Sequence, residues 1–354
     1  METSITSQDV TGRDPFGRFL SSLKLKPWQA ALLSFTVFAV YLFALPAYFG
    51  VLFPMEGLER SSIVDRVNQV GFLIIHPVVM FFYVWQSGVI ADLYRHVLPI
   101  TPVSGQAGLL RASRIAHAAS RVWMAAAWVG GGVAYLGVTF ILNLEVSRWY
   151  SVNWLMAGIL QASRFLLFYM IIVVIGRHLT MAFNLNRVYR HVKLPVLIGD
   201  SKYSASFDAI TRYGVSFAVF GGALGFFIAM RFFFSTPVFP EDAIFLGAYL
   251  ILVPLAFTLP FWQAHSNMRL ARQEALERIS DALQDEYDRL MLDLSSMETA
   301  ELPSERVNAL RSLLELTEKA PTWPFENWML YRVFAATVLP FIMTGLGLLL
   351  DLLI

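Results

Sequence analysis

Long apolar runs dominate the pattern of hydrophobic and polar positions along this chain. A helix needs about 20 residues to cross a hydrocarbon core of about 30 Å, and seven segments meet that length. They are residues 28–54, 67–88, 122–142, 154–176, 213–234, 244–262 and 328–350. The pattern therefore predicts an all-α, polytopic membrane protein with seven transmembrane helices.

Lys and Arg residues are concentrated in three of the connecting segments, 1–27, 89–121 and 177–212. Segments 55–66, 143–153 and 235–243 hold few basic residues, or balance them with acidic ones. The positive-inside rule places the first three segments in the cytoplasm, so the N-terminus is expected inside and the C-terminus outside. Tryptophans at the predicted span ends, including Trp28, Trp149 and Trp154, are expected at the headgroup region.

Composition agrees with a membrane location, since 56% of the 354 residues are hydrophobic and only 15% are charged. The expected location is the cell membrane, which means the inner membrane if the source is bacterial, and the expected partner is the lipid bilayer. The chain has no cysteine, which excludes disulfides, thiolate chemistry and cysteine-ligated metals.

Four regions follow from this pattern. Residues 1–27 form a cytoplasmic N-terminal segment, 28–262 the first six spans, 263–325 a cytoplasmic helical hairpin, and 326–354 the seventh span. A run of three glycines, Gly130 to Gly132, lies within the third span. Glycines in apolar helices let two helix backbones approach closely, so this patch predicts a packing surface rather than a ligand site.

The hairpin is acidic, because residues 263–320 contain 12 Asp and Glu against 7 Lys and Arg. Apolar side chains recur in it at helical spacing and form one stripe. We interpret this stripe as an assembly surface between identical subunits; its central residues are Leu276, Ile279, Leu283 and Leu290. The hairpin could instead dock under the basic connections, or be a solvated amphipathic surface without a special partner.

Two ionisable residues fall in the middle of predicted spans, where a charge costs about 2.5–3.5 kcal/mol on insertion scales. Arg164 in the fourth span is expected either to contact an anion or lipid headgroup, or to anchor neighbouring helices by hydrogen bonds. His76 precedes Pro77 in the second span. It is expected to be a core histidine with its hydrogen bonds satisfied, or else part of a functional site.

The last span carries a stripe of small and polar residues. Thr337, Thr344 and Asp351 are seven residues apart, and Pro340 and Gly347 lie between them. At 3.6 residues per turn these five share one helix face. Such a face ending in a carboxylate is suited to line a cation pore shared by several subunits, or to form a close packing surface.

No nucleotide-binding loop, nucleophile elbow or HExxH motif occurs in the chain, and its six histidines lack the spacing of a metal site. The expectation is therefore a protein that is not an enzyme and has no cofactor, no metal and no nucleic-acid partner.

The motif Ala320-Pro321-Thr322-Trp323-Pro324-Phe325, between an Arg- and Glu-rich helix and a last span, resembles the ending of uncharacterised prokaryotic multi-pass membrane proteins. The overall topology is similar to that of insect odorant and gustatory receptors, which are tetrameric cation channels. That similarity implies a homo-oligomeric, cation-conducting channel with an unknown transported ion. The alternatives are a monomeric or dimeric transporter, a lipid-binding membrane protein, or a non-conducting membrane scaffold.

Overall fold

The computed structural model describes most of the chain, and its described residues form an all-helical structure (87% helix) without strands. The described residues are 10–97, 122–143, 148–190, 201–234, 240–295, 302–320 and parts of 322–342.

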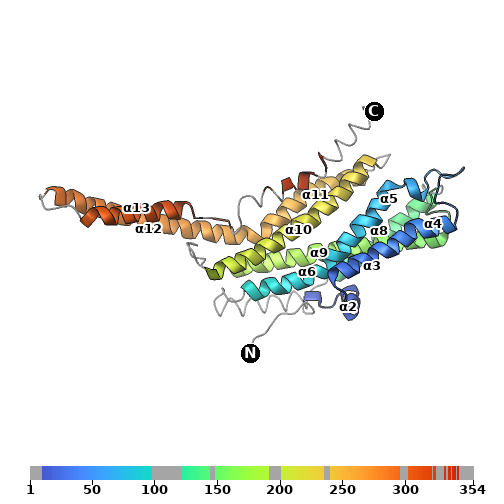
Figure 1. Cartoon of the computed structure of the whole chain (residues 1–354), viewed down its shortest axis with the longest axis horizontal. Helices are drawn as coiled ribbons and strands as arrows, with labels where there is room; N and C mark the ends of the chain where they lie inside the picture. Colours follow the sequence, from blue (N-terminus) through green and yellow to red (C-terminus); the bar gives the residue numbers. More distant parts are fainter. Residues whose placement is uncertain are drawn as a thin grey trace.

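A bundle of long helices is joined to a projecting pair of helices, as Figure 1 shows. The bundle elements are α2 (Pro15–Ser22), α3 (Pro27–Ala39), α4 (Leu45–Tyr48), α5 (Arg66–Val70), α6 (His76–Val97), α8 (Val122–Asn143), α9 (Trp154–Tyr189), α10 (Ser201–Phe234) and α11 (Pro240–Thr258). The projecting pair consists of α12 (Trp262–Ser295) and α13 (Leu302–Glu318).

Four helical stretches of the described chain are long and apolar enough to cross a membrane. They are Pro27–Tyr48, Arg66–His96, Trp154–Tyr189 and Asp208–Arg231, which match the first, second, fourth and fifth predicted spans. A shorter apolar helix, Val122–Val138, covers most of the third. Helical structure and a membrane-type bundle are therefore confirmed, whereas the count of seven and the orientation stay predictions. Most of the seventh predicted span lies outside the described residues.

Several helices extend beyond the predicted spans. The fourth span was expected to end at residue 176, but α9 continues to Tyr189 and has 36 residues. At 1.5 Å per residue it is about 54 Å long, well beyond the hydrocarbon core. The helix continues because residues 177–189 contain neither proline nor glycine. Part of the connection predicted at 177–212 is therefore helical, with α10 beginning at Ser201.

Prolines in the bundle are accommodated by wider turns and by side chains from neighbouring segments. A π-helical turn, Val40–Ala44, precedes Pro46, and another, Gly71–Ile75, precedes Pro77. Pro46 has no N–H group to offer the carbonyl of Leu42 four residues earlier. The hydroxyl of Ser62 donates to that carbonyl instead, at 2.6 Å. The helix thus contains proline without leaving this buried acceptor unpaired.

At the junction between α11 and α12, a side chain again donates to a carbonyl that a proline leaves without an N–H partner. Pro260 lies in a 3-10 turn and cannot donate to the carbonyl of Ala256. That carbonyl accepts instead from Nε2 of the fully buried His178 on α9, at 2.7 Å, while Nδ1 of the same ring lies 2.7 Å from the hydroxyl of Tyr213 on α10. Asn186, also on α9, donates to the carbonyl of Leu259. The base of the projecting pair is thereby fixed to α9.

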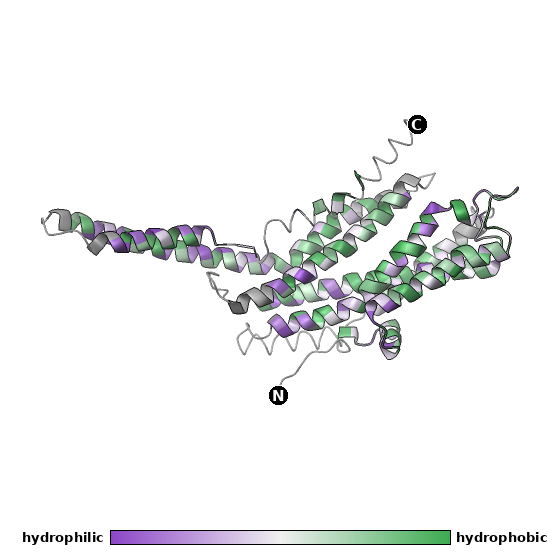
Figure 2. Ribbon diagram, viewed as in Figure 1, coloured by the Kyte–Doolittle hydropathy of each residue, from purple (hydrophilic) through white to green (hydrophobic). Residues whose placement is uncertain are grey.

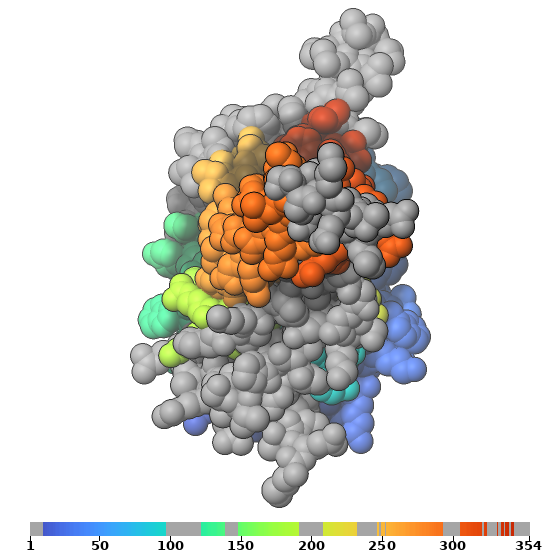
Figure 3. Space-filling view, turned by 90° about the vertical axis from the view of Figure 1, so that its left-hand side faces the viewer, coloured from blue at the N-terminus to red at the C-terminus, as the bar shows by residue number. Residues whose placement is uncertain are grey.

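Helices α12 and α13 pack against each other along their length and leave the bundle as an antiparallel hairpin (Figure 1). Hydrophilic and hydrophobic residues alternate along it, whereas the bundle is mostly hydrophobic (Figure 2). The Nε atom of Arg306 on α13 lies 3.6 Å from a carboxylate oxygen of Glu286 on α12, which forms an ion pair between the two helices. In the view along the hairpin, its atoms stand in front of the bundle (Figure 3). The pair therefore forms an arm outside the bundle.

Helices α8 and α9 approach closely at the glycine patch. A Cβ atom on Gly130 would lie 2.8 Å from the backbone carbonyl oxygen of Phe165, whereas one on Gly131 would meet nothing within 4 Å. Because a backbone atom cannot rotate away, the α8–α9 contact depends on Gly130. The two neighbours therefore have different roles.

We expect Gly130→Ala to lower the free energy of unfolding by about 1–3 kcal/mol, because the methyl group would force the two helices apart. Gly131→Ala is the matched control and should be neutral or stabilising by up to about 1 kcal/mol, since alanine favours the helix. Chemical unfolding of both variants in detergent tests this difference. Equal effects would show that the close approach at Gly130 is not required.

Candidate functional site

The N-terminal segment is held against the bundle through Asp14. Asp14 is the N-cap of α2, and its carboxylate accepts from the N–H of Gly17 at 3.1 Å. Pro15 follows at the first helical position, where its fixed φ angle suits a helix start. Asp14 is only 3% exposed, so its charge is buried where α2 meets α6 and α9.

Three further groups bind the same carboxylate. The hydroxyl of Tyr83 on α6 and that of Tyr169 on α9 both donate to it, the second at 2.6 Å. The guanidinium of Arg177 on α9 forms an ion pair with it at 2.8 Å. This group also donates to the backbone carbonyl of Tyr83 at 3.1 Å and lies over the Tyr83 ring, 4.9 Å from its centroid. We call Asp14, Tyr83, Tyr169 and Arg177 the Asp14 cluster.

A buried ion pair is stable only when additional hydrogen bonds satisfy the desolvated groups. The Asp14 cluster meets this condition, because its carboxylate accepts from one backbone N–H group, two hydroxyl groups and one guanidinium. The cluster joins a segment before the first span to two helices much later in the chain. Its direct role is to fix the position of residues 10–26.

This fixed segment presents a mixed apolar and basic surface. Phe19, Leu23 and Trp28 are 56%, 46% and 56% exposed. Exposed basic residues lie among them: Arg13, Arg18, Lys24 and Lys26. A surface with this composition is suited to a membrane interface, where apolar side chains lie below the headgroups and basic ones beside them.

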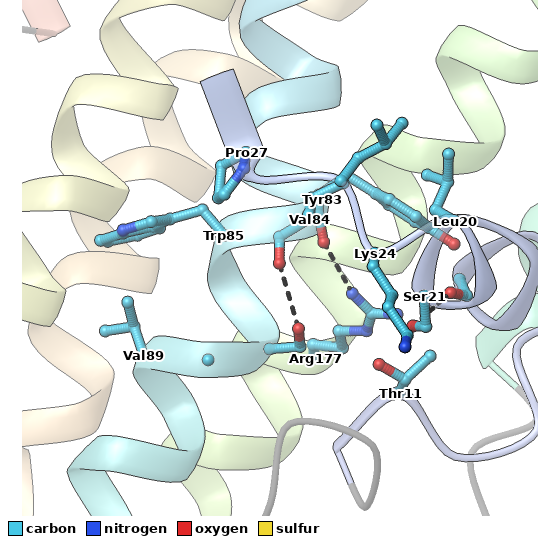
Figure 4. A pocket seen from close by; sticks show the side chains of 14 residues that line it. Thr11, Leu20, Ser21, Lys24, Pro27, Tyr83, Val84, Trp85, Val89 and Arg177 are labelled. Atoms are coloured by element: carbon cyan, nitrogen blue, oxygen red, sulfur yellow. Dashed lines mark hydrogen bonds between the residues drawn. The ribbon is translucent and has the colours of Figure 1, made fainter. Parts of the chain in front are cut away.

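A cavity of about 420 Å³ lies between this segment and α6. Its charged and hydroxyl side chains, Lys24, Ser21 and Thr11, lie toward one end with Leu20 beside them, and the apolar Trp85 and Val89 lie toward the other (Figure 4). Lys24 and Arg177 point toward the same part of the cavity, close to Thr11, while Trp85 and Val89 lie on the far side. A molecule with a charged group at one end and an apolar chain at the other would therefore match this arrangement of side chains.

His76 lies in the core of the bundle and is 1% exposed. Its Nε2 atom lies 3.4 Å from the carbonyl oxygen of Ser163, and its Nδ1 atom lies 3.2 Å from the hydroxyl of Ser34. Its ring packs on Phe38, with centroids 4.2 Å apart. Both ring nitrogens have partners, so His76 joins α3 to α9.

Arg164 lies on α9 beside α8. A Cβ atom on Gly137 would lie 2.7 Å from a guanidinium nitrogen of Arg164 and would also overlap the amide of Gln161. The two polar side chains therefore occupy the space left by this glycine. Neither amide atom of Gln161 has a hydrogen-bond partner among the described residues. Arg164 and Gln161, both on α9, thus place polar side chains against the backbone of α8 within a predicted span.

The structure describes only one of the five residues predicted to line a pore. Thr337 is 4% exposed, and the ring of Phe341 lies 5.6 Å from that of Tyr249 on α11. This part of the last span packs on its own chain. The other four, Pro340, Thr344, Gly347 and Asp351, lie outside the described residues.

The four predicted assembly residues all lie on α12 and are half-buried: Leu276, Ile279, Leu283 and Leu290. They belong to the helix that packs against α13. Other apolar side chains of the hairpin are more exposed, among them Tyr287 at 56% and Met291 at 53%. Surface for contact with another molecule is therefore available beside the predicted stripe.

Among the described residues, no three His, Asp or Glu side chains come together in a group that could hold a metal ion. The chain matches no protein-family model, no curated protein and no solved structure. Fold and site together define an all-helical protein with a membrane-type bundle, a helical arm and a fixed N-terminal segment.

The Asp14 cluster is not predictable from the sequence pattern. Asp14-Pro15 followed by Gly17 is a recognisable helix start, and could have indicated α2. By sequence alone, Arg177 is one of several basic residues in the connection 177–212. Its pairing with Asp14 joins positions 163 residues apart, which no local spacing reveals.

We expect Tyr169→Phe to lower the free energy of unfolding by about 1.5–3 kcal/mol, because it removes a hydrogen bond to a buried charge. Tyr135→Phe on α8 is the matched control; Tyr135 is 68% exposed, so its loss should cost less than about 0.5 kcal/mol. Chemical unfolding in detergent measures both. Equal values for the two variants would contradict the role of the Asp14 cluster.

Proposed function

We propose that this chain is a lipid-binding integral membrane protein that recognises anionic phospholipids through its N-terminal segment. The observation that carries this proposal is the exposed apolar and basic surface of residues 13–28, held in place by the Asp14 cluster. Neither a catalytic constellation nor a cofactor is needed for such a function.

Electrostatics supports the choice of an anionic lipid. Each basic residue close to an anionic membrane surface contributes about 1 kcal/mol of attraction. Arg13, Arg18 and Lys26 are exposed at the predicted inner end of the first span. Because Asp14 is paired with Arg177, its negative charge does not offset these three. The segment therefore combines apolar anchors with uncompensated positive charge.

The test is the stability of the purified protein in detergent with added lipid. A ligand that binds the folded state raises the unfolding free energy. We expect phosphatidylglycerol to raise the melting temperature more than phosphatidylcholine does, and the difference to shrink in about 1 M salt. Equal stabilisation by both lipids at low salt would overturn the proposal.

The triple variant Arg13→Gln, Arg18→Gln, Lys26→Gln should remove about 3 kcal/mol of the preference for phosphatidylglycerol. A matched variant with three exposed arginines of the hairpin changed, Arg278→Gln, Arg289→Gln and Arg311→Gln, loses the same charge away from the bundle. It should keep the wild-type preference. The same loss in both variants would mean that net charge, not this segment, sets the preference.

We propose a homo-oligomeric cation channel as the second candidate. The spacing of Thr337, Thr344 and Asp351 in the last span supports it. A further supporting observation is the apolar outer side of this span, where Phe334 and Ile342 are 67% and 51% exposed. A neighbouring subunit could cover that side.

In planar bilayers, the channel proposal predicts a cation current that Asp351→Asn reduces more at low than at high ionic strength, because salt screens a carboxylate ring. Assembly is tested by light scattering on Tyr287→Asp with Met291→Asp. These residues are exposed, so their change should separate subunits without unfolding the hairpin. A non-conducting wild type, or an unchanged current and oligomer size, would contradict this candidate.

A further inference from the structure

The backbone at Lys24 is unusual. Its φ angle is +50°, in the left-handed region that L-residues rarely adopt, and it is the single such non-glycine residue in the described part of the chain. It follows the C-cap of α2, a position where glycine is usually found. This conformational cost makes the Lys24 side chain a candidate for a functional role.

The amino group of Lys24 points into the polar end of the cavity between α2 and α6 (Figure 4). No ion pair to Lys24 occurs within the described ranges of the chain. Arg177 lines the same end, and its guanidinium is already paired with Asp14. The charges of Asp14 and Arg177 cancel each other. The positive charge of Lys24 therefore remains at this end of the cavity.

The other end of the cavity is apolar. Trp85 and Val89 lie there (Figure 4), and Gly88, which precedes Val89, also lines the cavity and has open space beside it, since a Cβ atom there would meet nothing within 4 Å. These three residues fall at the predicted inner end of the second span. A hydrocarbon chain could therefore extend from this end along α6 into the bilayer.

We propose that this cavity binds one anionic glycerophospholipid, with its phosphate at Lys24 and the start of an acyl chain beside Trp85. This inference rests on the proposed lipid-binding function and adds a single defined site to the general attraction of the segment. A charge-assisted hydrogen bond from the amino group to a phosphate oxygen provides the specificity. Arg177 borders the same phosphate position and is held there by the Asp14 cluster.

Two variants separate binding from folding. Lys24→Gly removes the charge and relieves the left-handed backbone, so the folded state should be no less stable than wild type. Gly88→Leu fills the open space with a residue that favours the helix. The controls are Arg311→Gln, an exposed arginine of α13 outside both the cavity and the N-terminal segment, and Gly158→Leu, an exposed helical glycine on α9 with open space around it.

The measurement is the Kd of phosphatidylglycerol for the purified protein, by native mass spectrometry, with phosphatidylcholine for comparison. We expect Lys24→Gly to weaken phosphatidylglycerol binding about tenfold or more, as loss of a charge-assisted hydrogen bond predicts. Gly88→Leu should also weaken it, because the leucine side chain occupies space that the acyl chain needs. Both controls should bind as wild type does. Melting temperatures of all variants verify that they are folded.

Wild-type Kd values in Lys24→Gly and Gly88→Leu would overturn the site; if the preference for phosphatidylglycerol persisted, the proposed function would stand. Displacement by soluble glycerol 3-phosphate at similar concentrations would show that the cavity takes a free phosphate ester, which overturns the lipid assignment. Absence of any preference in the wild type would overturn both the proposed function and this site.

Discussion

The buried ion pair between Asp14 and Arg177 is the interaction on which the functional surface depends. Placing two charges in a low-dielectric interior costs several kcal/mol per ion unless each is fully hydrogen-bonded. Here Tyr83 of α6, Tyr169 of α9 and the N–H of Gly17 all donate hydrogen bonds to the Asp14 carboxylate. A segment that precedes the first span thereby becomes a rigid part of the bundle. Arg13, Arg18 and Phe19 of this segment are then exposed on a fixed support.

Buried polar groups are also hydrogen-bonded elsewhere in the bundle. Polar side chains donate to backbone carbonyls that receive no N–H from the proline four residues later. Ser62 donates a hydrogen bond to the carbonyl of Leu42, and His178 donates one to the carbonyl of Ala256. In an apolar environment an unpaired carbonyl costs several kcal/mol, so these contacts strongly favour one arrangement of the helices. His76, buried between Ser34 and Ser163, acts in the same way between α3 and α9.

The apolar runs predicted the helices well, because a length of about 20 apolar residues leaves few alternatives to a membrane-type helix. The amphipathic stripe that includes Leu276 and Leu283 likewise predicted the long helix α12. What the pattern could not provide was tertiary pairing. Trp149 and Trp154 both end predicted spans, yet Trp149 is fully buried and donates to Asp65, whereas Trp154 is 84% exposed. Local composition does not distinguish these two tryptophans.

The most direct test of the central claim is a double-mutant cycle between Asp14 and Arg177. Unfolding free energies are measured for wild type, Asp14→Asn, Arg177→Gln and the double variant. If the pair fixes the segment, each single change leaves a buried charge unpaired and costs about 3–5 kcal/mol, and the double variant costs far less than their sum. Purely additive losses would show that the two residues are not coupled, and would contradict the account.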